Sequence, residues 1–175
     1  MISVPRKQIL GSQGLQELLQ LQCHSHLSLF PASVSLQRWT ASVSAFANGN
    51  GGEIYLGIEP KGSKGNSFAP FASEEEVLPV LTALEALLPL PRLYAVTLYG
   101  VQDTEQLLLH ISLSPCPTLI SGSDGRIYFR GGSQDLPCED PEKLRELSRR
   151  KALLSYEEEL SPYVLEDLAG VNGCE

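Results

Sequence analysis

The sequence lacks a surplus of basic residues. Its 175 residues include 13 Lys and Arg against 21 Asp and Glu, which gives a formal net charge of −8. Contacts with nucleic-acid phosphates normally need an excess of positive charge on at least one face, so this balance argues against a nucleic-acid binder. It does not exclude one, because electrostatic fields are local. Six of the acids and none of the bases lie after Leu154, so residues 1–154 carry 13 bases and 15 acids.

Long apolar runs and paired cysteines are also missing. No stretch approaches the roughly 18 apolar residues of a membrane-spanning helix, and the N-terminus has no signal-peptide pattern. The cysteines form no C-x-x-C pair, which excludes a zinc ribbon or a thioredoxin-like motif; they are Cys23, Cys116, Cys138 and Cys174. We therefore expect a cytoplasmic protein with reduced thiols, no membrane association, no metal and no cofactor.

The order of hydrophobic patterns predicts an α+β fold. Helical spacing or capping signals mark residues 14–22, 33–48 (capped by Ser33 or Ser35), 73–88, 140–151 and 155–168. Extended patterns mark residues 24–30, 53–58, 93–99, 107–113, 118–120 and 126–130, with turns at 102–105 and 123–125. Strands and helices do not alternate regularly, which favours α+β over a repeated strand-helix-strand architecture.

The most distinctive segment covers residues 44–59, S-A-F-A-N-G-N-G-G-E-I-Y-L-G-I-E. Its pattern predicts a helix that passes through a small turn, residues 48–52, into a buried strand. Such a turn can present several backbone N–H groups to an anion. The segment contains neither a Walker A motif nor G-x-G-x-x-G after a strand, and a purely structural turn is the alternative.

Together with residues 128–133, Y-F-R-G-G-S, this segment resembles the two signatures of the Schlafen-like, AlbA-type DNA-binding domain family. The signatures occur in the family's order, and the similarity spans about residues 10–168. The resemblance implies a mixed β-sheet with flanking helices, located at the N-terminus of a bacterial transcriptional regulator. It assigns residues 1–154 to this domain and residues 155–175 to an acidic helix or linker that leads to a C-terminal region.

Some members of this family, the Schlafen nucleases, cleave RNA with three acids. Two of these acidic residues belong to a Glu-x4-Glu-Phe-Lys motif, and the third acidic residue follows a Gly-Val pair. Aligning Phe30 with the Phe of that motif places His24 and Leu29 at the two Glu positions and Pro31 at the Lys, so that only Glu59 remains. A single carboxylate cannot hold Mg²⁺ against hydration. We therefore expect no nuclease site and no enzymatic activity.

Basic and polar residues supply the candidate nucleic-acid contacts. Period-two spacing places Arg126, Tyr128 and Arg130 on one strand face, which suits phosphate contacts and base stacking. A solvated sheet face is the alternative. Further candidates are Lys61 and Lys64, in the loop that follows the strand predicted at 53–58. Asn48 and Asn50, in the turn at 48–52, complete the set. A helix-end cluster, Arg145, Arg149, Arg150 and Lys151, is interpreted as complementing the helix dipole.

The three histidines give no clear catalytic site. His24 and His26 are expected on one face of a strand, where two imidazoles could in principle bind Zn²⁺ or Ni²⁺, but no third ligand is evident. We interpret them as surface or half-buried imidazoles. His110 lies in an apolar strand and is expected to be a hydrogen-bonded core or sheet-face residue rather than a catalytic base.

Three hypotheses follow. The first is a non-enzymatic nucleic-acid-binding module of a transcriptional regulator, with DNA favoured over RNA. The second is a protein-interaction or homo-oligomerisation module that has lost nucleic-acid binding, which the charge of −8 supports. The third is a metal-dependent RNA endonuclease that combines Glu59 with acids not identified from the sequence.

Overall fold

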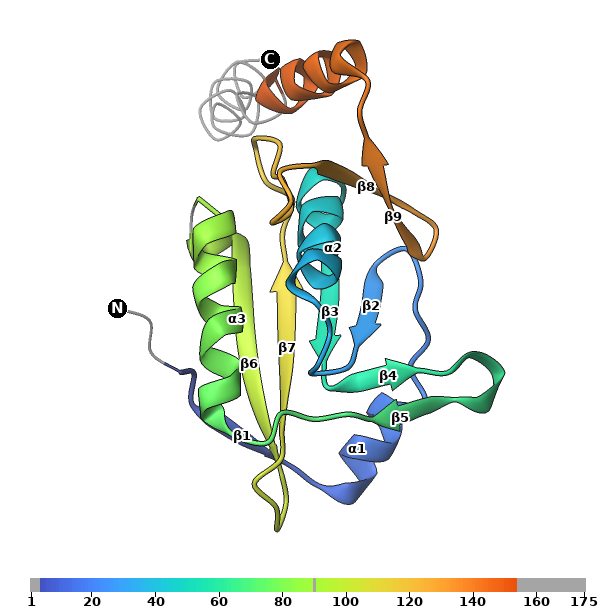
Figure 1. Ribbon diagram of the computed structural model, residues 1–175, viewed down its shortest axis with the longest axis vertical. Coiled ribbons are helices and arrows are strands. Elements are labelled where there is room, and N and C mark those ends of the chain that lie inside the picture. Colours follow the sequence, from blue (N-terminus) through green and yellow to red (C-terminus); the bar gives the residue numbers. More distant parts are fainter. Residues whose placement is uncertain (1–3, 90, 154–175) are drawn as a thin grey trace, which may run out of the picture.

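A mixed five-stranded sheet forms the centre of the molecule (Figure 1). The computed structural model describes residues 4–89 and 91–153. The strand order is β1-β6-β7-β3-β2. The strands are β1 (Lys7–Leu10), β2 (Leu27–Phe30), β3 (Gly52–Leu56), β6 (Tyr94–Val101) and β7 (Leu107–Leu113). The pairs β1–β6 and β2–β3 are parallel and the others antiparallel, which confirms the predicted α+β class.

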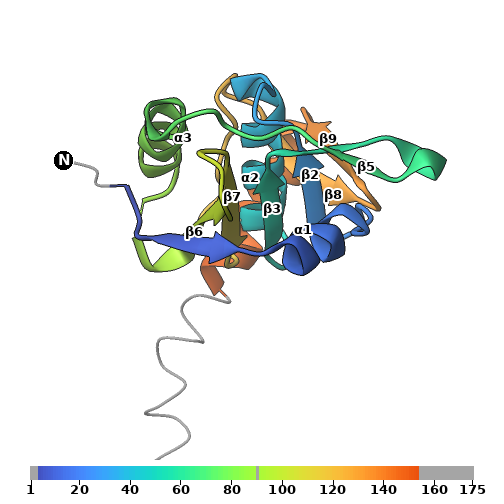
Figure 2. The same cartoon turned by 90° about the horizontal axis from the view of Figure 1, so that it is seen from below.

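Helices cover both faces of this sheet. Helices α2 (Leu36–Asn48) and α3 (Glu74–Leu87) lie on one face and α1 (Ser12–Leu19) on the other (Figures 1 and 2). Strand β7 shows why both faces need cover. Leu107, Leu109 and Ile111 belong to the core under α2 and α3, while Leu108 belongs to the smaller core under α1. Alternate residues of a strand point to opposite faces, so β7 is apolar on both sides.

Two hairpins extend beyond the sheet (Figure 1). The finger, residues 58–68, contains β4 (Ile58–Pro60), a 3₁₀ turn (Gly62–Lys64) and β5 (Asn66–Phe68). The second hairpin, β8 (Ile127–Gly131) and β9 (Gln134–Cys138), packs against α2 and leads into a helix at 141–153. A short 3₁₀ turn, Pro91–Leu93, precedes β6.

Helix α2 is enclosed between the sheet and the β8–β9 hairpin. Every residue from Trp39 to Asn48 is buried. Small residues allow this close approach: Ala41 and Ala45 pack against the ring of Tyr128. Polar residues spaced four apart, Thr40, Ser44 and Asn48, form what we call the α2 polar stripe. These side chains bond to the chain between residues 120 and 128, so the stripe attaches that segment and β8 to the helix.

Asn48 makes three hydrogen bonds to the segment 120–128, against two each from Thr40 and Ser44. Its Oδ1 accepts the Ile120 backbone N–H at 2.7 Å, and its Nδ2 donates to the Ile120 and Tyr128 carbonyls at 2.9 and 3.0 Å. Ser44 Oγ completes the set by accepting the Tyr128 N–H at 3.0 Å and donating to the Ile120 carbonyl. Asn48 is only 6% exposed, so these bonds satisfy groups that water could not reach easily.

Gly57 separates β3 from the finger. Its φ of +124° is rarely adopted by residues with a side chain, and a Cβ there would collide with the Leu108 side chain. Its backbone also connects two segments, because its N–H donates to the Phe30 carbonyl and its carbonyl accepts the Ala69 N–H, both at 2.7 Å. The single strand predicted at 53–58 is therefore divided at this glycine.

The structure corrects several sequence predictions. Residues 118–120 form no strand; Ile120 is instead held by the α2 polar stripe, and only Ser121 makes an isolated bridge, to Ile127. His24 and His26 lie in a turn, so the strand predicted from residue 24 begins at Leu27. The sequence patterns do not predict strands β1, β5 and β9, because each is short and contains no fully buried residue. Ser35 is the cap of α2.

The helix predicted at 155–168 lies outside the described residues. No helix within those residues is long and apolar enough to cross a membrane.

Replacing Asn48 tests the α2 polar stripe. Asn48→Ala removes the side-chain partner of the buried Ile120 N–H and of the Tyr128 carbonyl, while the Ile120 carbonyl keeps its hydrogen bond from Ser44. We expect it to lower the free energy of unfolding by about 3 kcal/mol in urea denaturation. Asn50→Ala is the matched control in the same turn, since Asn50 is exposed, and it should change stability by less than about 0.5 kcal/mol. Equal effects of the two variants would contradict the structural role of Asn48.

A second stability test concerns Gly57. Gly57→Ala combines an unfavourable φ with the Leu108 collision, and we expect it to cost about 3 kcal/mol. Gly62→Ala in the finger is the control, because Gly62 also has positive φ (+62°) but no heavy atom within 4 Å of an added Cβ. It should cost about 1 kcal/mol in the same denaturation assay. A Gly57 variant as stable as the Gly62 variant would show that the strand junction tolerates a side chain.

Candidate nucleic-acid interface

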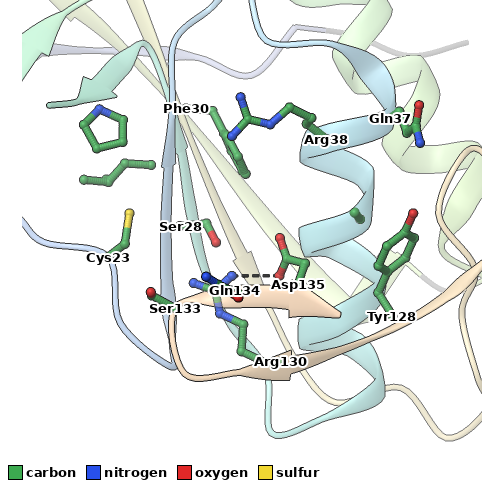
Figure 3. A pocket seen from close by; sticks show the side chains of 13 residues that line it. Cys23, Ser28, Phe30, Gln37, Arg38, Tyr128, Arg130, Ser133, Gln134 and Asp135 are labelled. Atoms are coloured by element: carbon green, nitrogen blue, oxygen red, sulfur yellow. Dashed lines mark hydrogen bonds and ion pairs between the residues drawn. The ribbon is translucent and has the colours of Figure 1, made fainter. Parts of the chain in front are cut away.

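A polar pocket of about 460 Å³ opens beside β2, the outermost strand of the sheet (Figure 3). Residues from three elements surround it. Strand β2 contributes residues 28–30, α2 contributes Gln37, Arg38 and Ala41, and the β8–β9 hairpin contributes Tyr128, Arg130 and residues 133–135. Cys23 and Pro60, the latter at the start of the finger, complete the wall. We call this the edge pocket.

Arg130 lies at the base of the edge pocket, where the carboxylate of Asp135 balances its charge. Its Nη1 is 2.7 Å from Asp135 Oδ1, and the two side chains are only 8% and 14% exposed. Its Nη2 donates to the carbonyls of His24 and Leu27 at 2.8 and 2.9 Å. Asp135 in turn accepts a hydrogen bond from Ser42. Arg130 therefore joins β8 to β2, and most of its donors are already occupied.

Tyr128 lies in the same pocket with its hydroxyl occupied. The hydroxyl donates to Asp124 Oδ2 at 2.5 Å. This bond raises the pKa of Tyr128 and lowers the pKa of Asp124, because it stabilises the neutral phenol together with the ionised carboxylate. With the side chain 93% buried between α2 and β8, Tyr128 offers little free ring surface.

Arg38 is the free cation of the edge pocket, and sequence analysis missed it. It is exposed, its guanidinium lies 5.6 Å from the centroid of the Phe30 ring, and no carboxylate within the described residues forms an ion pair with it. Figure 3 shows the side chain extending from α2 across Phe30. One signal could have found it: Arg38 lies in the first turn of α2, three residues after the cap Ser35, and that turn contains no acid.

Arg126 does not join the other two residues predicted to share its strand face. It precedes β8 and lies outside the edge pocket, while Tyr128 and Arg130 both line it. Its Nε is 3.8 Å from Glu139 Oε1, with both side chains more than half exposed. An exposed pair of this kind contributes little to stability, so Arg126 remains available for other contacts.

The remaining predicted residues occupy two other places. Lys61 and Lys64 lie exposed on the finger, beyond Pro60 of the edge pocket. Asn48 belongs to the α2 polar stripe, and both Asn48 and Asn50 line a separate pocket of about 640 Å³ at the C-terminal end of α2. The structure thus divides the residues predicted to contact nucleic acid between the edge pocket, the finger and the α2–β3 turn. They do not form one continuous surface.

Lys151 and Arg150, from the helix at 141–153, also line this second pocket. The Lys151 Nζ donates to the Cys116 carbonyl at 2.6 Å and to the Ala47 carbonyl at 3.2 Å, and burial lowers its pKa. Ala47 is in the last turn of α2, whose free carbonyls attract cations. Lys151 therefore fastens the C-terminal helix to the end of α2.

The positions of the family's nuclease acids are occupied by unsuitable or separated residues. Leu29 is 2% exposed and packed in the α1-side core, His24 lies in an exposed turn, and Glu59 is exposed on β4. Within residues 4–89 and 91–153, no group of three His, Cys, Asp or Glu side chains is placed to hold a metal ion.

The histidines have local partners. The ring of His24 accepts the His26 backbone N–H at its Nδ1, at 3.1 Å, within the turn before β2. His110 Nε2 lies 2.9 Å from Glu53 Oε1, and its ring stacks on Tyr55 with centroids 4.4 Å apart. The expectation that His110 is a hydrogen-bonded sheet-face residue is confirmed. Burial and the neighbouring Glu53 carboxylate raise the pKa of Tyr55 to about 12.

Comparison with known proteins supports the fold and the family. The DIP2311 protein from Corynebacterium diphtheriae has a crystal structure similar to this chain, with a TM-score of 0.52 and 15% sequence identity. The similarity covers 73% of this chain but only 27% of that one, so this chain spans about a quarter of the length of that protein. No curated protein sequence matches significantly. The family model described as Schlafen, AlbA_2 matches residues 24–139, which is more than half of the sequence, and the chain therefore belongs to the Schlafen AlbA_2 family.

Proposed function

We propose that this chain is a non-enzymatic nucleic-acid-binding domain, with DNA favoured over RNA, that serves a transcriptional regulator. The observation that carries the proposal is the proximity of the edge pocket, with the uncompensated Arg38 at its mouth, to a finger that bears two exposed lysines. Pro60 belongs to both features, so a strand bound along the finger would pass the pocket. Membership of the Schlafen AlbA_2 family supports a nucleic-acid-related role.

Local charge makes this proposal compatible with the acidic composition. Phosphate binding depends on the cations within about 10 Å, because salt screens more distant charges. Arg38, Lys61 and Lys64 have no carboxylate partner within ion-pair distance in the described part of the chain. Arg130 contributes less, since Asp135 neutralises it. Binding through three or so cations should be weak and strongly dependent on salt.

The non-enzymatic part of the proposal depends on the missing carboxylates. Leu29 cannot coordinate a metal, and the imidazole of His24 offers a nitrogen where Mg²⁺ prefers oxygen. Glu59 remains as one exposed carboxylate on β4, which is insufficient to position a cation and to activate water.

The finger lysines provide the test of phosphate binding. The double variant Lys61→Ala/Lys64→Ala should lower affinity for a labelled oligonucleotide and make the slope of log K against log salt less steep by about 1.8 for duplex DNA. Fluorescence anisotropy at several salt concentrations measures both quantities. Lys7→Ala is the matched control, because Lys7 is an exposed lysine on β1 at the opposite edge of the sheet, and it should leave the slope unchanged.

Two outcomes would overturn this proposal. Wild-type protein that binds neither DNA nor RNA at low salt would contradict it directly. Self-association in analytical ultracentrifugation without any effect of DNA would instead favour the protein-interaction alternative. An unchanged salt slope in the double variant would remove the finger from the interface.

Incubation with structured RNA tests the absence of catalysis. We expect no cleavage in the presence of Mg²⁺ or Mn²⁺, because the chain lacks two of the family's three carboxylates. Gel analysis of a labelled RNA measures this, and Glu59→Ala should behave like the wild type. Metal-dependent cleavage that Glu59→Ala abolishes would show that the domain is an endonuclease.

A further inference from the structure

We infer that the edge pocket receives one unpaired nucleobase, so that the domain selects single-stranded over double-stranded nucleic acid. This inference rests on the proposed nucleic-acid binding and adds the form of the ligand. It comes from three features of the pocket: an open peptide group, a hollow behind the strand edge and a free cation at the mouth.

The open peptide group belongs to Leu29. His26, just before β2, and Phe30, at its end, direct their carbonyls toward β3, since these carbonyls accept N–H groups from Glu53 and Gly57 at 2.9 and 2.7 Å. Alternate residues of a strand direct their peptide groups to opposite edges. Residues 27 and 29 therefore face the outer edge, where the pocket lies.

The outward-facing peptide N–H and C=O of Leu27 have hydrogen-bond partners, and those of Leu29 have none within the described residues. The Leu27 carbonyl accepts from Arg130 Nη2 and from the His24 N–H, and its own N–H donates to the His24 carbonyl. No outer partner for the Leu29 peptide groups lies in residues 4–89 and 91–153, and Leu29, which is only 2% exposed, lines the edge pocket. An adjacent N–H and C=O at a strand edge can bond to an acceptor and a donor that are adjacent on a ligand.

This single open residue argues against a peptide as the occupant. Adding a peptide strand to a sheet edge needs a row of free backbone groups. The edge of β2 offers only Leu29, because Arg130 and the His24 turn block the residues before it. Each nucleobase, in contrast, has an adjacent hydrogen-bond donor and acceptor on its Watson–Crick edge, which matches the N–H and C=O of one residue.

The shape of the pocket requires the base to be unpaired. Its volume, about 460 Å³, falls within the roughly 300–1,000 Å³ of small-molecule sites. Figure 3 shows Arg38 and Phe30 on one side and the β8–β9 hairpin on the other, with Ser28 between them. A base inside a duplex has its pairing edge occupied and its faces stacked, so it could enter only after extrusion. A single strand offers its bases without that cost.

Charge at the pocket is arranged for a neutral group inside and a phosphate outside. The Arg130–Asp135 pair and the Ser28–Ser42 bond leave the interior polar but without net charge. Arg38 at the mouth is free to hold the phosphate that follows the base. The guanidinium over Phe30 also provides a planar surface against which a base can stack.

Cys23 and Arg38 allow a direct test with the full-length chain. Cys23 lines the edge pocket, whereas Cys138 is a comparably exposed thiol outside it. A 12-nucleotide single strand at about ten times its Kd should slow iodoacetamide alkylation of Cys23 by up to about tenfold, with Cys138 unaffected. Mass spectrometry of the modified peptides measures both rates, and the same experiment is repeated with the matching duplex, in DNA and in RNA.

Anisotropy completes the test. We expect the single strand to bind more tightly than the duplex, and Arg38→Ala to lower single-strand affinity by about tenfold. Arg92→Ala, an exposed arginine between α3 and β6, is the matched control and should have no effect. Equal affinity for both forms with unchanged Cys23 alkylation would overturn the base-binding pocket while leaving phosphate binding intact. Binding to neither form would overturn the proposed function as well.

Discussion

The hydrogen bonds between the α2 polar stripe and the segment before β8 are the constraint on which the rest of the structure depends. A helix buried on every side must satisfy any polar group it carries, and α2 does so by bonding to chain more than 70 residues away. Asn48 and Ser44 bond to backbone groups of Ile120, which lies outside any helix or strand, and of Tyr128 in β8. Without these bonds, neither the position of β8 nor the outer wall of the edge pocket would be defined.

The same arrangement decides which cations are available. Placing the β8–β9 hairpin over α2 brings Arg130 against the edge of β2, where it bonds to two carbonyls and to Asp135. Arg130 therefore acts mainly as a connection between elements. Arg38 lies one helical turn into α2 on the solvent side of the same pocket and has no such partners. An arginine that no sequence motif contains is thus the better placed of the two for an anionic ligand.

The residues that carry the family resemblance have structural explanations in this chain. Asn48 bonds to Ile120 and Tyr128, Gly57 allows the sharp exit of β3 beneath Leu108, and Arg130 joins β8 to β2. Each is needed to bring distant segments together, which accounts for two ordered motifs indicating the fold so well. Chemistry depends on other positions, and there the chain has Leu29 and His24 in place of carboxylates. The residues that carry the family resemblance are therefore different from those that align with the acids of its nuclease members.

The sequence by itself determined the fold class, the long central helices, strand β7 and the turn after Asn48, because periodicity and capping are local properties. It also identified the family from residues 44–59 and 128–133. Only the tertiary structure decided that Asn48 faces inward and that Tyr128 and Arg130 are largely occupied. It also decided that Arg38 has no ion-pair partner, and the Leu29 peptide group no outer hydrogen-bond partner, within the described residues. Whether a polar group is free depends on partners that are distant in the sequence, and local patterns do not contain that information.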